Sequence, residues 1–258
     1  MAFSIAYQLF SARDTFDSDM IGHLKSLKDS GYDGVELAGY YGVSPHYLRG
    51  VCDVIGLKIV SAHLSYWTLT ENIDVTISNL KALGCEYVAI PGAFGIFIGS
   101  DYYTKFLDGF EKLGLSLADA GITLLYHNHA FEFDKFNGDT GLDVLYSSLD
   151  PAAVSAELDA GFAQYSGYDP AKIIRQYKGR IPVVHLKDYE AGEDDIGEMT
   201  CPVGEGVLDL PGILDAASYS GTKWLVIEQD RQNWCGKGAL ECAAVSASNL
   251  LKLTEKYV

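Results

Sequence analysis

Short apolar segments rich in β-branched residues recur along this chain, and longer segments with helical spacing separate them. Eight of the apolar segments have the length of a buried strand. They cover residues 4–10, 34–39, 58–66, 87–92, 123–129, 154–161, 183–189 and 224–230. Strands that alternate with helices favour a parallel sheet whose connections are right-handed crossovers.

The separating segments carry recognisable helix signals. The segment DSDMIGHLKSLKDSG starts with an aspartate suited to N-capping and ends at Gly31, and TENIDVTISNLKALG ends at Gly84 in the same way. Asp169 and Pro170 supply an N-cap and a proline in the first turn. We therefore expect helices over 17–31, 70–84, 101–121, 169–179 and 238–257.

Eight strand–helix units in 258 residues match the size of a (β/α)8 barrel. An open doubly wound sheet is the main alternative, but it would normally carry a glycine-rich phosphate turn after the first strand. The stretch SIAYQLFSARD has no glycine at that point. The pattern therefore predicts an α/β protein with a single TIM-barrel domain over residues 1–258.

Charge and composition narrow the function. The net charge of −16 disfavours a nucleic-acid partner, because an acidic surface repels phosphate backbones. The five cysteines show no CxxC spacing, so neither a disulfide framework nor a thiolate zinc site is indicated. The N-terminal stretch lacks a signal-peptide pattern, and no apolar run approaches the roughly 20 residues of a membrane helix. We expect a cytoplasmic protein without a membrane partner.

Ionisable residues stand at the ends of most predicted strands. In a TIM barrel these carboxyl-terminal ends meet on one face, where the active site is built. A lone buried histidine is usually a hydrogen-bonded core residue, but here strand after strand contributes a charge or an imidazole. The residues are Glu36, His63, His127, His129, Glu132, Asp159, His185, Lys187, Asp188, Glu228 and Asp230.

Three of these residues, Asp159, His185 and Glu228, follow apolar strands in which an isolated charge would be costly. A shared metal ion would remove that cost. Carboxylates together with imidazole suit one divalent cation such as Mn²⁺, Zn²⁺, Co²⁺ or Mg²⁺. Structural alternatives stay open, since Asp159 could cap a turn and Lys187 could form a salt bridge with it.

Several short motifs together resemble a known family. GYDGVELAG, SAHLS, YHNHAFEF, ELDAGF, VVHLKD, PVGEG and VIEQD occur here in order. In this combination the chain resembles the xylose isomerase-like TIM-barrel superfamily, and within it the sugar phosphate isomerase/epimerase group, which includes ketose 3-epimerases and inosose dehydratases. The resemblance implies one divalent metal held by Glu, Asp, His and Glu, of which the last three map onto Asp159, His185 and Glu228.

The chain differs from the family pattern at the metal ligand that the fifth strand supplies. Many relatives end this strand with Glu-Asn-His, whereas this chain has His127-Asn128-His129. Glu132 follows five residues after the usual carboxylate position and could return from the loop. We expect Glu132 to be the metal ligand, with His127 as the alternative.

The resemblance also implies a reaction. Family members act on a keto- or aldo-sugar, or its phosphate, through a metal-stabilised enediolate, with carboxylates as base and acid. Here these would be Glu228 and Glu132, with His127 or His129 as rival bases. His63, His129, Lys187 and Glu205 are expected to bind substrate. The same first step could end in elimination, which gives a dehydratase or lyase acting on a keto-inositol, keto-sugar or glycoside.

Two other functions fit the sequence less well. An abasic-site endonuclease on this barrel would need more metal ligands and a basic face, which six histidines and the acidic charge do not supply. A sugar-binding barrel without catalysis would have no need for the Asp159, His185 and Glu228 set. A homo-oligomer is compatible with barrels of this kind, and the expected partner is a small sugar.

Overall fold

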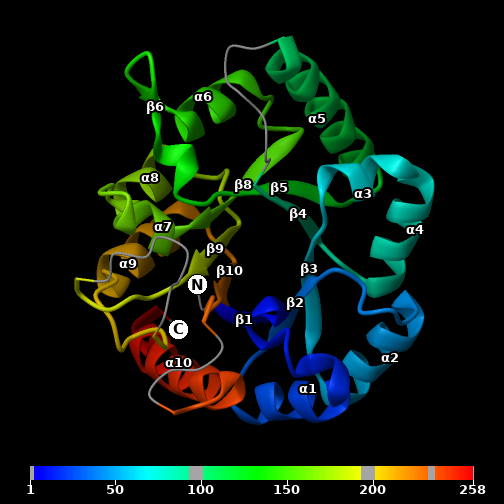
Figure 1. Ribbon diagram of the computed structural model, residues 1–258, viewed down its shortest axis with the longest axis vertical. Helices are drawn as coiled ribbons and strands as arrows, with labels where there is room; N and C mark the ends of the chain where they lie inside the picture. The colour runs from blue at the N-terminus through cyan, green and yellow to red at the C-terminus, as the bar shows by residue number, and fades with distance from the viewer. Residues whose placement is uncertain (1–2, 93–100, 193–200, 232–235, 258) are drawn as a thin grey trace.

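Eight parallel strands close into a barrel with helices around it (Figure 1). The computed structural model describes residues 3–92, 101–192, 201–231 and 236–257. Around the barrel the strands follow the order β1-β10-β9-β8-β5-β4-β3-β2. Their bounds are β1 Ser4–Gln8, β2 Gly34–Ala38, β3 Lys58–His63, β4 Tyr87–Pro91, β5 Thr123–His127, β8 Val154–Asp159, β9 Val183–Leu186 and β10 Trp224–Ile227. The predicted α/β TIM barrel with a single domain is confirmed.

The strands end earlier than the apolar pattern predicts. β5 ends at His127 rather than residue 129, and β9 ends at Leu186 rather than residue 189. At these points the backbone leaves the ladder to form loops. Asp159 shows the reason, since it closes β8 and also caps the next helix by accepting a hydrogen bond from the backbone N–H of Phe162 at 2.8 Å.

Helices cover the outside of the barrel. Each of the five predicted helices is present, and the capping predictions hold, because Asp169 accepts from Lys172 N and Gly84 adopts a left-handed conformation. The helices are α1 Met20–Asp29, α2 Pro45–Ile55, α3 Tyr66–Glu71, α4 Ile73–Leu83, α5 Asp101–Asp119, α6 Gly141–Ser148, α7 Ala160–Tyr165, α8 Pro170–Gln176, α9 Leu210–Ser220 and α10 Ala239–Thr254.

Smaller elements decorate the loops. A two-stranded hairpin of β6 Lys135–Phe136 and β7 Asp139–Thr140 follows β5. Short 3₁₀ helices cover Leu9–Ala12, Phe16–Ser18, Phe131–Phe133 and Glu255–Tyr257. The third of these follows directly on the sequence His127-Asn128-His129 and therefore decides where Glu132 points.

The barrel interior changes character along its axis. A small apolar cluster that includes Leu125, Val183 and Val226 fills its lower part. Because side chains on a strand alternate with a period of two, the next inward positions are His127, His185 and Glu228. An apolar floor thus lies directly beneath a layer of ionisable groups. A separate and larger apolar core packs the strands against the helices.

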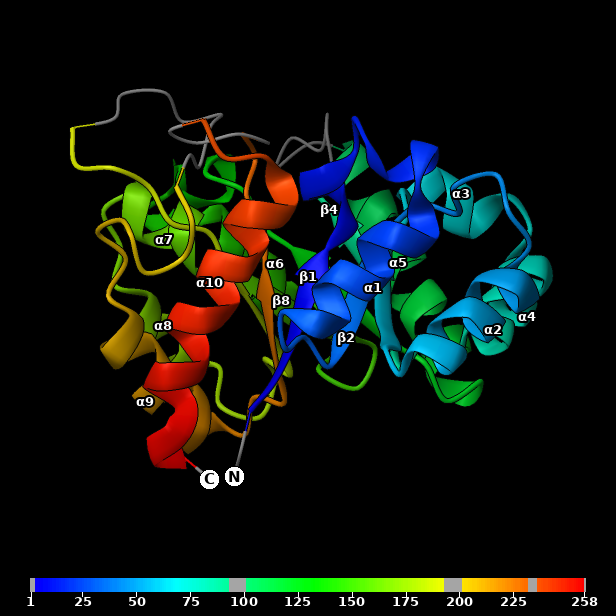
Figure 2. The same ribbon diagram turned by 90° about the horizontal axis from the view of Figure 1, so that it is seen from below.

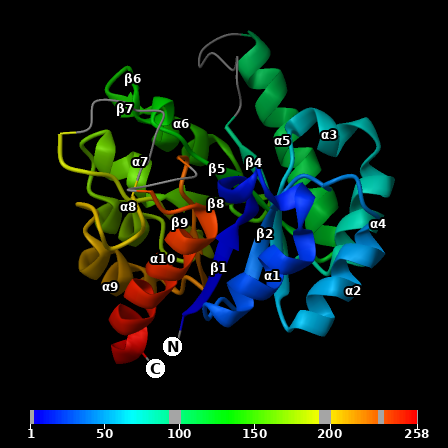
Figure 3. The same cartoon turned by 60° about the horizontal axis from the view of Figure 1, so that its bottom comes forward.

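The two ends of the described chain meet at the end of the barrel opposite this layer (Figure 2). The rings of Phe3 and Tyr257 lie 5.3 Å apart there. α1 and α10 also contact each other beside β1 (Figure 3). Among the described residues, none of the helices combines the length and the apolar character that crossing a bilayer requires.

Candidate active site

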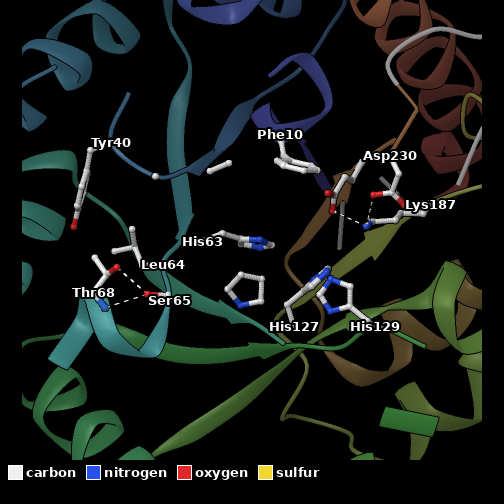
Figure 4. Close-up of a pocket in the computed structure, with 14 residues that line it drawn as sticks. Phe10, Tyr40, His63, Leu64, Ser65, Thr68, His127, His129, Lys187 and Asp230 are labelled. Atoms are coloured by element: carbon white, nitrogen blue, oxygen red, sulfur yellow. Dashed lines mark hydrogen bonds and ion pairs between the residues drawn. The ribbon is translucent and has the colours of Figure 1, made fainter. Parts of the chain in front are cut away.

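Inward-facing side chains from six strands converge at the carboxyl ends of the barrel. Strand register sets their neighbours, since His127 pairs with Glu157 across β5 and β8, and Asp159 pairs with His185 across β8 and β9. β2 adds Glu36 and β3 adds His63. Figure 4 shows His63 facing His127 and His129 from one side, with Lys187 and Asp230 on the other.

The inner part of the site is a buried cluster of three imidazoles around one carboxylate oxygen. Oε2 of Glu157 lies 2.6 Å from Nε2 of His63 and 3.4 Å from Nε2 of His185. Nδ1 of His127 lies 3.2 Å from the same oxygen, without the alignment of a hydrogen bond. Glu36 closes the cluster, with 2.9 Å contacts to Nε2 of both His63 and His185.

Mutual pairing sets the protonation of this cluster. Burial by itself would lower the pKa of His63, but Glu36 and Glu157 outweigh it and raise that pKa to about 10. The same two carboxylates raise the pKa of His185 against the effect of burial. Burial would raise the pKa values of Glu36 and Glu157, yet the imidazoles hold both at about 2. In the inner cluster the ionised carboxylates and the protonated imidazoles therefore neutralise one another.

A second group of donor atoms lies on the cavity side of the His127 and His185 rings. Oδ2 of Asp159 lies 3.9 Å from Nε2 of His127, and Oε2 of Glu228 lies 3.0 Å from Nδ1 of His185. One donor atom from each of these four residues lies within 4.8 Å of the other three. His127 and His185 thus each present one nitrogen to the inner carboxylates and the other to this outer group.

Lys187 closes the outer group on one side. Its ammonium lies 3.0 Å from Asp230, 3.2 Å from Glu228 and 3.6 Å from Asp159. Burial would lower the pKa of Lys187, but these carboxylates, Glu228 first, raise it above its usual range. The expected salt bridge between Lys187 and Asp159 is therefore present as one contact within a larger set.

The pKa of the Asp159 carboxyl group is raised by its surroundings. Burial raises its pKa to about 7, although Lys187 and His185 act in the opposite direction. For Glu228, the effects of Lys187 and His185 outweigh burial and hold the pKa well below its usual range. Burial and the neighbouring imidazole of His185 lower the pKa of His127, so its ring is neutral.

These outer residues fit a divalent metal ion. Oδ2 of Asp159 is fully buried and accepts no hydrogen bond from the described residues, so it has an unused lone pair. Two imidazoles and two carboxylates are a suitable donor set for a cation such as Zn²⁺ or Mn²⁺. The inner group of His63, His127, Glu157 and His185 is also compact, but its central Glu157 oxygen already lies 2.6 Å from Nε2 of His63 and 3.4 Å from Nε2 of His185.

Glu132 lies apart from the outer group. Its Oε1 accepts a short hydrogen bond from the hydroxyl of Tyr126 at 2.5 Å, and its Oε2 accepts from the backbone N–H of His129 at 2.8 Å. Burial raises the pKa of Glu132 to about 7 despite these donors. The structure therefore places Glu132 beneath the turn that carries His129, and places His127 among the four grouped donors.

A cavity of about 550 Å³ opens above the outer group. Among the predicted substrate-binding residues, His63, His129 and Lys187 line it. Glu205 is not among the lining residues of the described chain, and its carboxylate accepts a hydrogen bond from Asn249 at 3.2 Å. Asp188 points away from the cavity and accepts the backbone N–H groups of Gly204, Gly206 and Leu208.

Sequence reasoning overlooked Glu157, which occupies the centre of the inner cluster. The motif VSAELDAG contains the signal, because Glu157 precedes Asp159 by two residues and must share its side of the strand. An inward carboxylate one layer below a candidate ligand is the position from which a histidine ligand is oriented. Period-two alternation applied to both residues would have identified it.

Comparison with known proteins matches this chain to one family of barrels. A family model described as xylose isomerase-like TIM barrel matches residues 24–252. Over 238 residues the chain is 26% identical to an inosose dehydratase of Lacticaseibacillus casei, a match that covers 78% of this chain and 79% of that protein.

Solved structures share the fold. A sugar phosphate isomerase/epimerase from Parabacteroides distasonis superposes with a TM-score of 0.80 at 23% identity, covering 100% of this chain and 96% of that one. The IolI protein, whose structure contains a zinc atom, superposes with a TM-score of 0.76 at 17% identity, covering 99% of each chain.

Replacing Glu157 tests the inner cluster. We expect Glu157→Gln to lower the free energy of unfolding of the metal-free protein by about 3–5 kcal/mol at pH 7, because His63 and His185 lose a buried counter-charge. Urea denaturation followed by circular dichroism measures this. The exposed Glu71 provides the control, and Glu71→Gln should change little. A loss below about 1 kcal/mol for Glu157→Gln would contradict the role of the cluster.

The pH dependence of stability tests the charge on His63. A histidine whose pKa is raised by folding stabilises fully below its unfolded value near 6.5 and loses that contribution as the pH rises toward about 10. We expect the stability of the metal-free protein to fall between about pH 7 and 8.5. In His63→Gln the slope should be smaller by about 1.4 kcal/mol per pH unit. Equal slopes in the two proteins would show that His63 is neutral when folded.

Proposed function

The chain belongs to the xylose isomerase-like TIM barrel family, and on that premise we propose that it is an enzyme that moves a proton at a carbon next to a sugar carbonyl. Its expected reaction is the isomerisation or epimerisation of a keto- or aldo-sugar. One observation carries the proposal, namely that His127, Asp159, His185 and Glu228 bring four donor atoms together at the wall of a cavity. Such convergence of ligands with a pocket is typical of metal-assisted catalysis.

His127, Asp159, His185 and Glu228 would hold a divalent ion, such as Zn²⁺, Mn²⁺, Co²⁺ or Mg²⁺. The chemistry that such an ion supplies is polarisation of a carbonyl, which acidifies the neighbouring C–H bond. Within this set His127 takes the place that the resemblance assigns to a glutamate. Glu36 and Glu157 lie behind the imidazole rings of this set and help to orient them, because Glu36 accepts a hydrogen bond from Nε2 of His185 and Glu157 lies 3.2 Å from Nδ1 of His127.

Two groups that line the cavity are suited to proton transfer. Glu228 is ionised and lines one wall. His129 lines the cavity as well, and burial together with Lys187 lowers its pKa to about 4, so its imidazole is neutral and able to accept a proton near pH 7. Glu132 supports His129 through the backbone hydrogen bond described above. Lys187 and His63 are placed to bind substrate oxygens.

The cavity favours an unphosphorylated sugar. Lys187 is the one cationic side chain of Lys or Arg type among its lining residues in the described chain, and three carboxylates already surround it. A phosphate would need donors that are not already neutralised. The substrate is therefore a neutral sugar or polyol ketone.

Dehydration is the second candidate. The similarity to an inosose dehydratase over 78% of the chain favours it. His129 would remove the same proton, and the hydroxyl group at the next carbon would then take that proton from the His129 imidazolium and leave as water. The first step is shared, so one assay detects both reactions.

Metal content of purified variants tests the ligand set. We expect one equivalent of divalent metal in the wild type, and at least a hundredfold weaker binding in Asp159→Asn and His127→Gln, because each removes a donor. Glu132→Gln is the matched control and should keep the metal, since both oxygens of Glu132 are bound elsewhere. Retention by His127→Gln together with loss by Glu132→Gln would instead assign Glu132 as the ligand.

Exchange of substrate hydrogen with deuterated water tests the reaction. The metal-loaded enzyme should exchange the hydrogen next to the carbonyl in one or more members of a panel of ketoses, aldoses and 2-keto-inositol, as followed by NMR. His129→Gln should keep its metal and slow the exchange by about 10²–10⁴-fold, and Glu205→Gln should not change it. Loss of a hydroxyl group would identify the dehydratase. No exchange with any panel member would refute the proposed function.

A further inference from the structure

A second cavity, of about 730 Å³, adjoins the first. Both cavities are lined by His129 and Asp230, so they share a wall. Each lies within the range of about 300–1,000 Å³ that is typical of small-molecule sites. A single sugar ring placed over the outer donor group would leave the second cavity without any part of the substrate.

The lining of this second cavity is mainly aromatic. Besides the imidazole of His129, five phenylalanine and tyrosine rings line it, from Phe131, Phe133, Phe162, Tyr165 and Tyr168. Phe131 is 42% exposed although it is a large apolar residue, and its ring is stacked on His129 with the centroids 5.6 Å apart and the planes at 7°. Exposed rings at the edge of a site are a surface on which another ring can stack.

Phe162 joins the two cavities. Its buried ring lies 4.6 Å from the ammonium of Lys187 and 5.3 Å from the ring of His129. The side chains that would bind the reacting sugar are thus packed directly against the wall of the aromatic cavity. Phe133 and Tyr168, stacked with centroids 5.1 Å apart, form another part of its lining.

The charges at this cavity disfavour an anionic ligand, because Asp134 lines it and the Asp230 carboxylate already pairs with Lys187 at 3.0 Å. Asp134 and Asp230 are among its lining residues, whereas neither lysine nor arginine of the described chain is. A carboxylate or phosphate would meet like charge there. A neutral ring would meet aromatic faces instead.

We propose that the second cavity binds the aglycone of a glycoside, so that the substrate is a keto-sugar that carries a neutral ring, either aryl or glycosyl, and not a free sugar or cyclitol. This inference rests on the proposed function for the place of the sugar, and it defines the substrate class of that site. The sugar carbonyl lies over the outer donor group, and the attached ring stacks in the aromatic cavity beside Phe131.

Binding of three sets of keto-sugar glycosides, prepared from glucosides, galactosides and xylosides, to the metal-loaded protein tests this. The first set carries a methyl aglycone, the second a phenyl ring and the third a second glucose, and isothermal titration calorimetry gives each dissociation constant. At least one sugar with a ring aglycone should bind about tenfold or more tightly than its methyl counterpart. A preference for phenyl identifies an aryl aglycone, and a preference for glucose identifies a glycosyl one.

Variants of two exposed phenylalanines supply the control. Phe131→Ala should remove most of the preference for the ring-bearing glycosides and leave methyl glycoside binding unchanged. Phe136→Ala alters a similarly exposed ring in the β6–β7 hairpin that lines neither cavity, and it should preserve the preference. Equal affinities for methyl and ring aglycones in the wild type, or no binding of any ring-bearing glycoside at 10 mM (on the order of a weak fragment affinity), would overturn the proposal.

The outcome is separate from that of the exchange experiment. A ring preference without hydrogen exchange on any keto-sugar would refute the proposed reaction and keep the aglycone site. Exchange on free sugars without a ring preference would refute the aglycone site and keep the reaction.

Discussion

The need to compensate buried charge governs the interior of this barrel. Glu36 and Glu157 are fully buried, and neither could remain ionised without the imidazoles around them. Those imidazoles belong to His63, His127 and His185, each from a different strand. Because a ring has two nitrogens, the contact with an inner carboxylate also determines which nitrogen of His127 and His185 faces the cavity. The inner carboxylates Glu36 and Glu157 therefore determine which ring nitrogens the outer group can offer to a ligand.

The fold follows from the sequence because its signals are local. Apolar runs at strand length and glycine or aspartate at helix ends predict all eight strands and five of the helices. α2 was overlooked although Ser44 caps it, Pro45 opens it and Gly56 ends it in a left-handed conformation. Strand ends are predicted too late because inward polar residues continue the alternation after the ladder has ended, as at His129, two residues beyond the end of β5.

The site follows from the sequence only in part. The convergence of Asp159, His185 and Glu228 could be anticipated, since the carboxyl ends of barrel strands share one face. The direction of Glu132 could not, because it depends on a 3₁₀ turn and on the hydroxyl of Tyr126. The aromatic cavity could not be anticipated either, since its rings come from loops and from α7, whose relative placement is not a local property of the chain.

The 3.2 Å approach of His127 to Glu157 also bears on how this sequence can change over generations. A carboxylate at position 127 would lie against Glu157, and the cluster would then hold three carboxylates and only the two imidazoles of His63 and His185. Replacing the imidazole at position 127 by the glutamate that the family resemblance implies there would therefore cost less stability if position 157 were changed as well. Either change alone passes through a less stable protein. The barrel interior thus couples the side chains that positions 127 and 157 can carry.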